Sequence, residues 1–235
     1  MTMPDELRTY LQSNGADMVG FANLQDVAAD VRDNFPYGIS IAVALNPEII
    51  SGIQDGPTSQ YYAEYERANN LLDRLGHYAV QFLEERGHQA KWFAATSAGI
   101  DPETLSTRLP HKTTATRAGL GWIGKCAVLV TRGFGSAVRI TTVLTDAVLP
   151  AGEPIDESYC GNCTACVDAC PGHAPSGKDW QVGLNRDSFF DAFACRTTAR
   201  ELALKRVGIQ ETICGVCIAV CPWTQKYVRK EARLA

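Results

Sequence analysis

The chain has 235 residues, of which 46% are hydrophobic, enough for one large domain or for a medium domain with an appended module. Its net charge of −4 excludes a chain-wide electrostatic surface for nucleic acid. The N-terminal sequence has no basic region followed by an apolar run, and no stretch approaches the roughly 20 apolar residues of a membrane span. We therefore expect a cytoplasmic protein without a membrane partner.

The first part of the chain alternates between apolar runs of strand length and helical periodicity. Residues 5–13 predict a short helix, and residues 16–22 and 38–45 predict strands. Residues 48–59 are rich in Gly, Pro, Ser and Asp and predict a loop. From residue 60 to residue 86 apolar positions recur at intervals of three and four, which predicts a long amphipathic helix.

The elements that follow are shorter. They are a strand at 90–96, a charged loop at 101–111, a helix at 113–118, and strands near 127–131 and 137–145. This mixture of strands and helices predicts an α/β or α+β layer domain over residues 1–150.

Cysteines organise the remainder of the chain. The run from Cys160 to Pro171 has the spacing CxxCxxCxxxCP, and a shortened form, CxxCxxxCP, runs from Cys214 to Pro222. The three thiolates of a CxxCxxC loop point toward one place, which suits three corners of a cubane, whereas the fourth cysteine, before the proline, ligates the other cluster. The pattern predicts a ferredoxin-like module with two [4Fe-4S] clusters over residues 151–235.

Eight of the nine cysteines fill the two predicted clusters. The shortened motif lacks one thiolate, and Cys195 is the natural donor because it lies between the motifs, whereas Cys126 lies far upstream. We expect Cys126 to be a small buried residue rather than a nucleophile activated by Lys125. The predicted ligands are Cys160, Cys163, Cys166 and Cys221 for cluster one, and Cys170, Cys195, Cys214 and Cys217 for cluster two.

Zinc sites and a disulfide framework are the competing interpretations of these cysteines. Zinc ribbons usually separate two CxxC pairs by about a dozen residues or more, whereas three cysteines here fall between Cys160 and Cys166. A chain without a signal peptide is expected in a reducing compartment, where thiols stay free to bind metal. Iron–sulfur clusters are therefore favoured, with a zinc-stabilised binding module as an alternative.

A glycine-rich segment, Arg-Ala-Gly-Leu-Gly-Trp-Ile-Gly-Lys, runs from Arg117 to Lys125 ahead of both cysteine motifs. This segment, the motifs and their order resemble the epoxyqueuosine reductases and, more distantly, the reductive dehalogenases, over residues 16–227. The resemblance implies a nitroreductase-like, cobalamin-binding domain followed by a ferredoxin-like module whose clusters reduce the corrinoid. It also implies an iron–sulfur oxidoreductase with the same eight cysteine ligands.

One departure from that family concerns the proton donor. In the tRNA-modifying enzymes an acidic residue stands shortly before the Ala-Gly-Leu-Gly segment, where an ungapped register places Leu105 and Ser106. Asp101 and Glu103 lie close by and are the catalytic candidates, although the sequence assigns the role to neither. The acidic pI of about 5.6 argues against tRNA as a partner, so a sibling reductase with another substrate is expected.

The polar segment before these glycines combines cations, a histidine and hydroxyls at the start of a helix, a set that suits an anionic group of a cofactor or substrate. A capped helix start with solvated charges is the alternative. The glycines permit close backbone approach and Trp122 offers a flat face. No clear βαβ unit with an acidic residue about 20 positions on surrounds them, which argues against an NAD site. The predicted cofactor-binding residues are Arg108, His111, Lys112, Thr113, Arg117, Gly119, Gly121, Trp122, Gly124 and Lys125.

Two stretches of the chain are basic although its net charge is negative. They are either solvated helix faces or a docking surface for an acidic electron donor or for RNA. They consist of Arg196, Arg200, Lys205 and Arg206, and of Lys226, Arg229, Lys230 and Arg233.

Together these features predict a reductase that passes electrons from an external low-potential donor, such as ferredoxin or flavodoxin, through two [4Fe-4S] clusters. The acceptor is a substrate or a cofactor in the domain of residues 1–150, with cobalamin as the first candidate and a flavin as the second. The alternative is an electron-transfer partner or reductive activator of a separate corrinoid protein, with no second cofactor of its own.

Overall fold

The computed structural model describes residues 2–96 and 99–233 as a mixed α/β structure. Its chain divides into two compact units that interleave along the sequence. The first unit comprises Met1–Ala44, Arg67–Leu120 and Arg139–Ile155, and the second comprises Leu45–Glu66, Gly121–Val138 and Asp156–Ala235. The sequence predicts two domains with a boundary near residue 150. The division into these two units does not test whether those domains fold independently, so the boundary stays a prediction.

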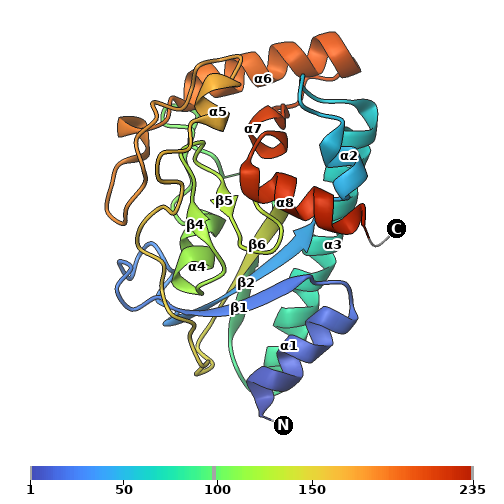
Figure 1. The fold of residues 1–235 in the computed structure, drawn as a ribbon. Helices are drawn as coiled ribbons and strands as arrows, with labels where there is room; N and C mark the ends of the chain where they lie inside the picture. Colours follow the sequence, from blue (N-terminus) through green and yellow to red (C-terminus); the bar gives the residue numbers. More distant parts are fainter. Residues whose placement is uncertain (1, 97–98, 234–235) are drawn as a thin grey trace. The chain divides into compact units, whose positions relative to one another are not determined.

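A four-stranded sheet in the order β1-β2-β6-β3 forms the centre of the first unit (Figure 1). β1 (Met18–Asn23) pairs antiparallel with β2 (Tyr37–Ala44), and β3 (Ala90–Phe93) pairs antiparallel with β6 (Val138–Thr145). Six consecutive residues of β2 are buried, as the continuous apolar run predicts for a strand covered on both faces. Because β1 is the first strand in this order, it lies at one edge of the sheet. The cavity described below lies along this edge.

Helices cover both faces of this edge. α1 (Met3–Ser13) begins two residues before the predicted start because the Asp5 carboxylate accepts a hydrogen bond from the Thr2 backbone nitrogen at 3.2 Å. α3 (Ser59–Glu84) is the predicted long helix, and its residues from Arg67 onward belong to this unit. α4 (His111–Arg117) packs against β1 and β2.

The second unit contains short elements held by loops. The cysteine motifs leave little room for regular structure between them, and no long strand forms among its described residues. Its elements are α2 (Pro47–Ser51), the start of α3, a hairpin of β4 (Trp122–Ile123) and β5 (Leu129–Val130), α5 (Ala165–Asp168), the 3-10 helix η1 (Arg186–Ser188), α6 (Ala192–Val207), α7 (Val216–Ala219) and α8 (Pro222–Glu231).

The loop prediction for residues 48–59 is wrong at its start, where α2 forms. The Asn46 side chain accepts hydrogen bonds from the backbone nitrogens of Glu48 and Ile49, and Pro47 occupies the first helical turn. An Asn cap followed by proline is a helix start signal, which the loop-like composition of the following residues obscured. α2 packs against α8, and the Tyr227 hydroxyl of α8 donates a hydrogen bond to the Leu45 carbonyl at 3.1 Å.

None of the helices in the described ranges is both long and apolar enough to cross a membrane.

Candidate metal centres and cofactor site

Four cysteines from the two motifs surround one cavity of about 90 Å³ in the second unit. Cys160 and Cys163 come from the loop that leads into α5, and Cys166 from α5 itself. In this loop the Cys163 backbone nitrogen donates a hydrogen bond to the Cys160 carbonyl at 3.1 Å. The fourth, Cys221, is the N-cap residue of α8. The cavity is lined by Cys160, Cys163, Cys166, Cys221, Gly124, Lys125, Cys126, Val130, Pro222 and Trp223.

These four cysteines are the set predicted for cluster one. In a [4Fe-4S] cluster each thiolate binds a different iron, so the ligand sulfurs surround a volume instead of meeting at one ion. Across the described residues, no three His, Cys, Asp or Glu side chains converge as they would on a single metal ion. A soft donor set of four thiols around a small closed volume fits such a cluster.

A second group of thiols gathers around α6. Burial first, and then the neighbouring thiols of Cys170 and Cys214, raise the pKa of Cys195 to about 11. Burial also raises the pKa of Cys214, and Cys170 adds to that shift. These three thiols are therefore neighbours, and Cys217 follows within one turn, in α7. Three of the four thiols predicted for cluster two are thus brought together, Cys195 by α6, whereas the fourth, Cys217, interacts with Cys126.

Cys126 lies between the two groups. It is 5% exposed. Hydrogen bonding with Cys166 lowers the pKa of Cys126, but an interaction with Cys217 and burial raise it, and the net result is a pKa well above the usual value. A thiol with a raised pKa is a poor nucleophile at neutral pH, which agrees with the expectation of a buried, unreactive residue. Its contact with one ligand of each predicted cluster was not foreseen.

Lys125 faces the loop of the first cysteine motif. The residue is 5% exposed, and its Nζ donates a hydrogen bond to the Gly161 carbonyl at 2.6 Å. The Asp179 carboxylate lies 3.9 Å from the same Nζ. Among the predicted cofactor-binding residues, Lys125 and Gly124 thus line the cysteine cavity.

Trp122 is fully buried in the same unit. Its ring centroid lies 5.1 Å from that of Tyr159 and 5.2 Å from that of Trp223, the second in an edge-to-face arrangement. Trp223 lines the cysteine cavity. Trp122 therefore serves here as the centre of an aromatic cluster, and its ring is not an open platform.

Two glycines of the predicted site belong to different units. Gly119 has φ +71°, and a Cβ there would lie 2.6 Å from the Glu153 carbonyl oxygen. A Cβ on Gly121 would lie 2.2 Å from the Val130 carbonyl oxygen. Close backbone packing accounts for both glycines. Gly119 packs against the backbone of Glu153, and Gly121 packs against that of Val130.

The polar residues before these glycines find partners within the first unit. Arg108 forms an ion pair with Asp33, and an Arg117 guanidinium nitrogen donates to the Ile155 carbonyl at 3.1 Å. His111 Nε2 lies 2.9 Å from the Ala94 carbonyl oxygen, so it carries the proton. Lys112 and Thr113 are half-buried on α4. These contacts favour the structural alternative for this segment, while its role in binding a cofactor stays a prediction.

The catalytic candidates lie in an exposed turn. The Asp101 carboxylate accepts a hydrogen bond from the Glu103 backbone nitrogen at 2.8 Å, and the turn closes where the Asp101 backbone nitrogen donates to the Ser106 carbonyl. Both acidic side chains are exposed. Their assignment as proton donors stays a prediction.

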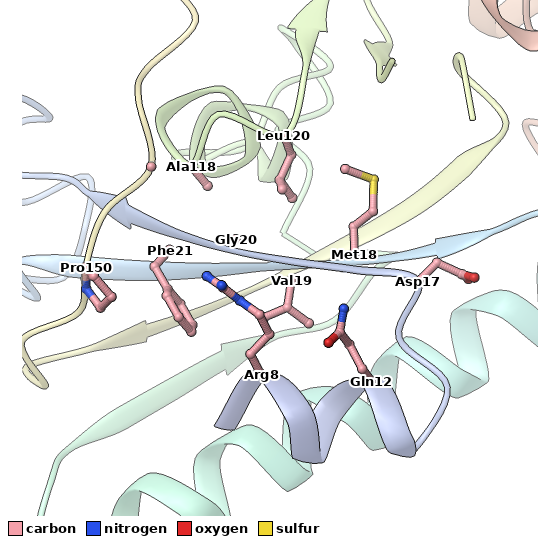
Figure 2. Close-up of a pocket in the computed structure, with 11 residues that line it drawn as sticks. Arg8, Gln12, Asp17, Met18, Val19, Gly20, Phe21, Ala118, Leu120 and Pro150 are labelled. Atoms are coloured by element: carbon pink, nitrogen blue, oxygen red, sulfur yellow. The ribbon is translucent and has the colours of Figure 1, made fainter. Parts of the chain in front are cut away.

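The sequence did not indicate a cavity of about 390 Å³ along the free edge of β1 (Figure 2). Figure 2 shows Arg8 and Gln12 of α1 on one side of the strand, with Ala118 and Leu120 on the other. The Arg8 Nε is buried without a hydrogen-bond partner among the described residues, and its guanidinium lies 4.9 Å from the centre of the Phe21 ring. The spacing of Arg8 and Gln12 by one helical turn was the available signal.

Comparison with known proteins now adds to this geometry. The family description "4Fe-4S double cluster binding domain" matches residues 159–224, which contain all eight predicted ligands of the two clusters, Cys195 between the motifs included. The second unit thus carries the sequence of a double [4Fe-4S] protein.

Curated relatives extend the match to most of the chain. The epoxyqueuosine reductase of Synechocystis sp. (strain ATCC 27184 / PCC 6803 / Kazusa) is 30% identical over an alignment of 247 positions. This alignment covers 97% of this chain and 78% of the relative. That of Synechococcus sp. (strain RCC307) is 32% identical over 82% of this chain and 56% of the relative. The chain belongs to the epoxyqueuosine reductase family, and it spans little more than half the length of several curated relatives it matches.

Solved structures share the fold. An epoxyqueuosine reductase solved with a tRNA-Tyr epoxyqueuosine-modified stem loop superposes with a TM-score of 0.63 at 21% identity, over 94% of this chain and 65% of that one. A reductive dehalogenase, described as suggesting a mechanism for B12-dependent dehalogenation, gives a TM-score of 0.70 at 18% identity over 97% of this chain and 32% of that one. The α/β fold with a double-cluster module is therefore shared, whereas the nitroreductase-like description of the first part stays a prediction.

Proposed function

We propose that this protein is an iron–sulfur oxidoreductase that passes electrons through two [4Fe-4S] clusters. The observation that carries the proposal is the cavity lined by Cys160, Cys163, Cys166 and Cys221. The second group of thiols, in which Cys170 and Cys214 neighbour Cys195, supports it. Membership of a family whose curated members are named as reductases supports the oxidoreductase class. A cytoplasmic location, where a reducing environment keeps thiols free, is part of the proposal.

The acceptor of the electrons is proposed to be a corrinoid, with a flavin as the second choice. A B12-dependent neighbour with the same fold over 97% of this chain supports the corrinoid. When bound, such a cofactor supplies a strongly reducing metal centre, while this chain supplies the electrons and the binding site. The candidate residues for holding it are those predicted from the sequence.

The acidic composition of this chain does not exclude tRNA, although we expected from the sequence that it would. A solved epoxyqueuosine reductase with the same fold contains a tRNA stem loop. Overall charge is a weak guide to one local surface, since basic stretches occur within an acidic chain. tRNA therefore belongs among the substrates to be tested.

A reductive activator without a second cofactor is the alternative function. The observation that favours it is the Asp101 carboxylate, which is engaged by the Glu103 backbone nitrogen in an exposed turn and so offers no preformed proton donor.

Anaerobic reconstitution tests the proposal. We expect about eight iron and eight sulfide per chain, absorbance near 400 nm and electron paramagnetic resonance signals from two reduced clusters. The same sample is titrated with cobalamin and with flavins, and then assayed for reduction of an epoxyqueuosine-containing tRNA stem loop. Zinc without iron and sulfide would contradict the iron–sulfur proposal, whereas intact clusters without binding of either cofactor would favour the activator.

A further inference from the structure

α6 exposes large apolar side chains and buries small ones. Phe193 and Leu204 are 50% and 55% exposed, whereas Ala199 and Ala203 are at most 3% exposed. A helix that only packed on its own domain would show the reverse pattern. The side chains that α6 leaves in solvent therefore call for a partner or another function.

The exposed side chains form one stripe. Phe193, Thr197, Arg200 and Leu204 are spaced by four, three and four residues, so they share one face of the helix. All four are exposed. A hollow of about 280 Å³ on this stripe is lined by Arg200, Glu201, Leu204 and Gln210.

Positive charge surrounds the stripe. α6 carries four cations and one anion, a net charge of +3 against −4 for the whole chain. Arg200 is held in place by a hydrogen bond from its Nε to the Thr212 hydroxyl at 3.2 Å, and Lys205 is exposed. The stripe thus has a fixed positive charge at Arg200, with the apolar side chains of Phe193 and Leu204 on either side of it along the helix.

The same helix carries a ligand of predicted cluster two. Cys195 lies two residues after Phe193 and five residues before Arg200, so it is on the other side of the helix from the exposed stripe. The Cys170 and Cys214 thiols are its neighbours there. A protein that docked on the exposed stripe of α6 (Figure 1) would be separated from this thiol by the width of one helix, about 10–12 Å with side chains. Electron transfer becomes slower with distance, so this short separation favours a donor.

We propose that the exposed face of α6, formed by Phe193, Arg200, Leu204 and Lys205, is the docking surface for a small acidic electron-carrier protein. The inference rests on the proposed function, because it assumes cluster two at Cys195. Opposite charge accelerates encounter between the proteins, and a surface with two exposed apolar side chains suits the small interfaces of transient redox complexes. The acidic surface of the carrier is the chemistry that complements the surplus of positive charge.

Charge reversal on α6 tests this docking surface. Reduced flavodoxin, an acidic carrier, is mixed anaerobically with reconstituted protein, and the second-order rate of electron transfer is measured at several salt concentrations. We expect Arg200→Glu with Lys205→Glu to lower the rate at least tenfold at low salt, with a smaller difference at high salt. Glu201→Lys is expected to raise the rate, and Phe193→Ser with Leu204→Ser to lower it at all salt concentrations.

The matched control is Arg229→Glu with Lys230→Glu on α8, which changes the net charge equally. We expect it to keep the wild-type rate within about twofold. Cluster content and complete reduction by excess dithionite verify that each variant is folded and loaded; loss of clusters in the wild type would overturn the proposed function. Equal rates for wild-type and α6 variants, an equal loss in the α8 control, or a wild-type protein that accepts no electrons from flavodoxin would overturn the docking surface. So would a loss confined to binding of a tRNA stem loop.

Discussion

Lys125 donates a hydrogen bond of 2.6 Å to the backbone carbonyl of Gly161, the residue that follows the first cysteine of the first motif. This contact joins the glycine-rich segment to the cysteine loop and places a buried cation at the cavity of predicted cluster one. The two features that carry the family resemblance are therefore in direct contact within the second unit.

Replacement of Lys125 by Met should lower the reduction potential of cluster one. A positive charge stabilises the reduced cluster, and an effective dielectric constant of about 20 gives an interaction on the order of 1–3 kcal/mol. For a one-electron couple this corresponds to about 40–130 mV. Potentiometric titration followed by electron paramagnetic resonance measures the shift. Lys125→Arg, which keeps the charge, should stay near the wild-type potential; an equal shift in both variants would mean that packing, and not charge, sets it.

Substitution of Cys195 by Ala should remove cluster two and leave cluster one. Iron content after reconstitution is expected to fall from about eight to about four per chain. Cys126→Ala is the matched control, since it removes a buried thiol that is not a predicted ligand, and it should keep about eight. If Cys126→Ala lost as much iron as Cys195→Ala, the assignment of the ninth cysteine would be wrong.

Patterns within a short stretch of sequence predicted much of this structure. Helical periodicity located α3, apolar runs located β1 and β2, and cysteine spacing indicated the thiol group that lines the cavity of Cys160 and Cys221. Each of these signals depends on residues within a few turns of one another, or on a motif whose geometry is known in advance.

Contacts between distant segments were beyond the sequence. Lys125 and Gly161 are 36 residues apart, and Arg108 and Asp33 are 75 residues apart. No periodicity links such pairs, so the predicted anion site could not be distinguished from ion pairs within the protein. The cavity beside Arg8 escaped detection for the same reason, because α1 and residues 118–120 meet only in the folded chain.

His111 should make the protein less stable in mild acid. Burial is the main cause that lowers the pKa of His111, although the Ala94 carbonyl opposes it and Arg139 reinforces it. Because the folded-state pKa lies below the unfolded value of about 6.5, the stabilising contribution is present above that pH and is lost as pH falls through the folded-state pKa. The free energy of unfolding, measured by denaturant titration between pH 7.5 and 5, should decline more in the wild type than in His111→Gln. Parallel declines in the two proteins would contradict this explanation.

Gly121→Ala should destabilise the second unit because the added Cβ would lie 2.2 Å from the Val130 carbonyl oxygen of the paired strand. Backbone on both sides leaves little room for relaxation, and overpacking of this kind typically costs about 1–3 kcal/mol. Gly133→Ala is the matched control, since nothing lies within 4 Å of its added Cβ. Denaturant titration of both variants, each loaded with clusters, compares them. If Gly121→Ala is as stable as Gly133→Ala, close packing of β4 on β5 does not require this glycine.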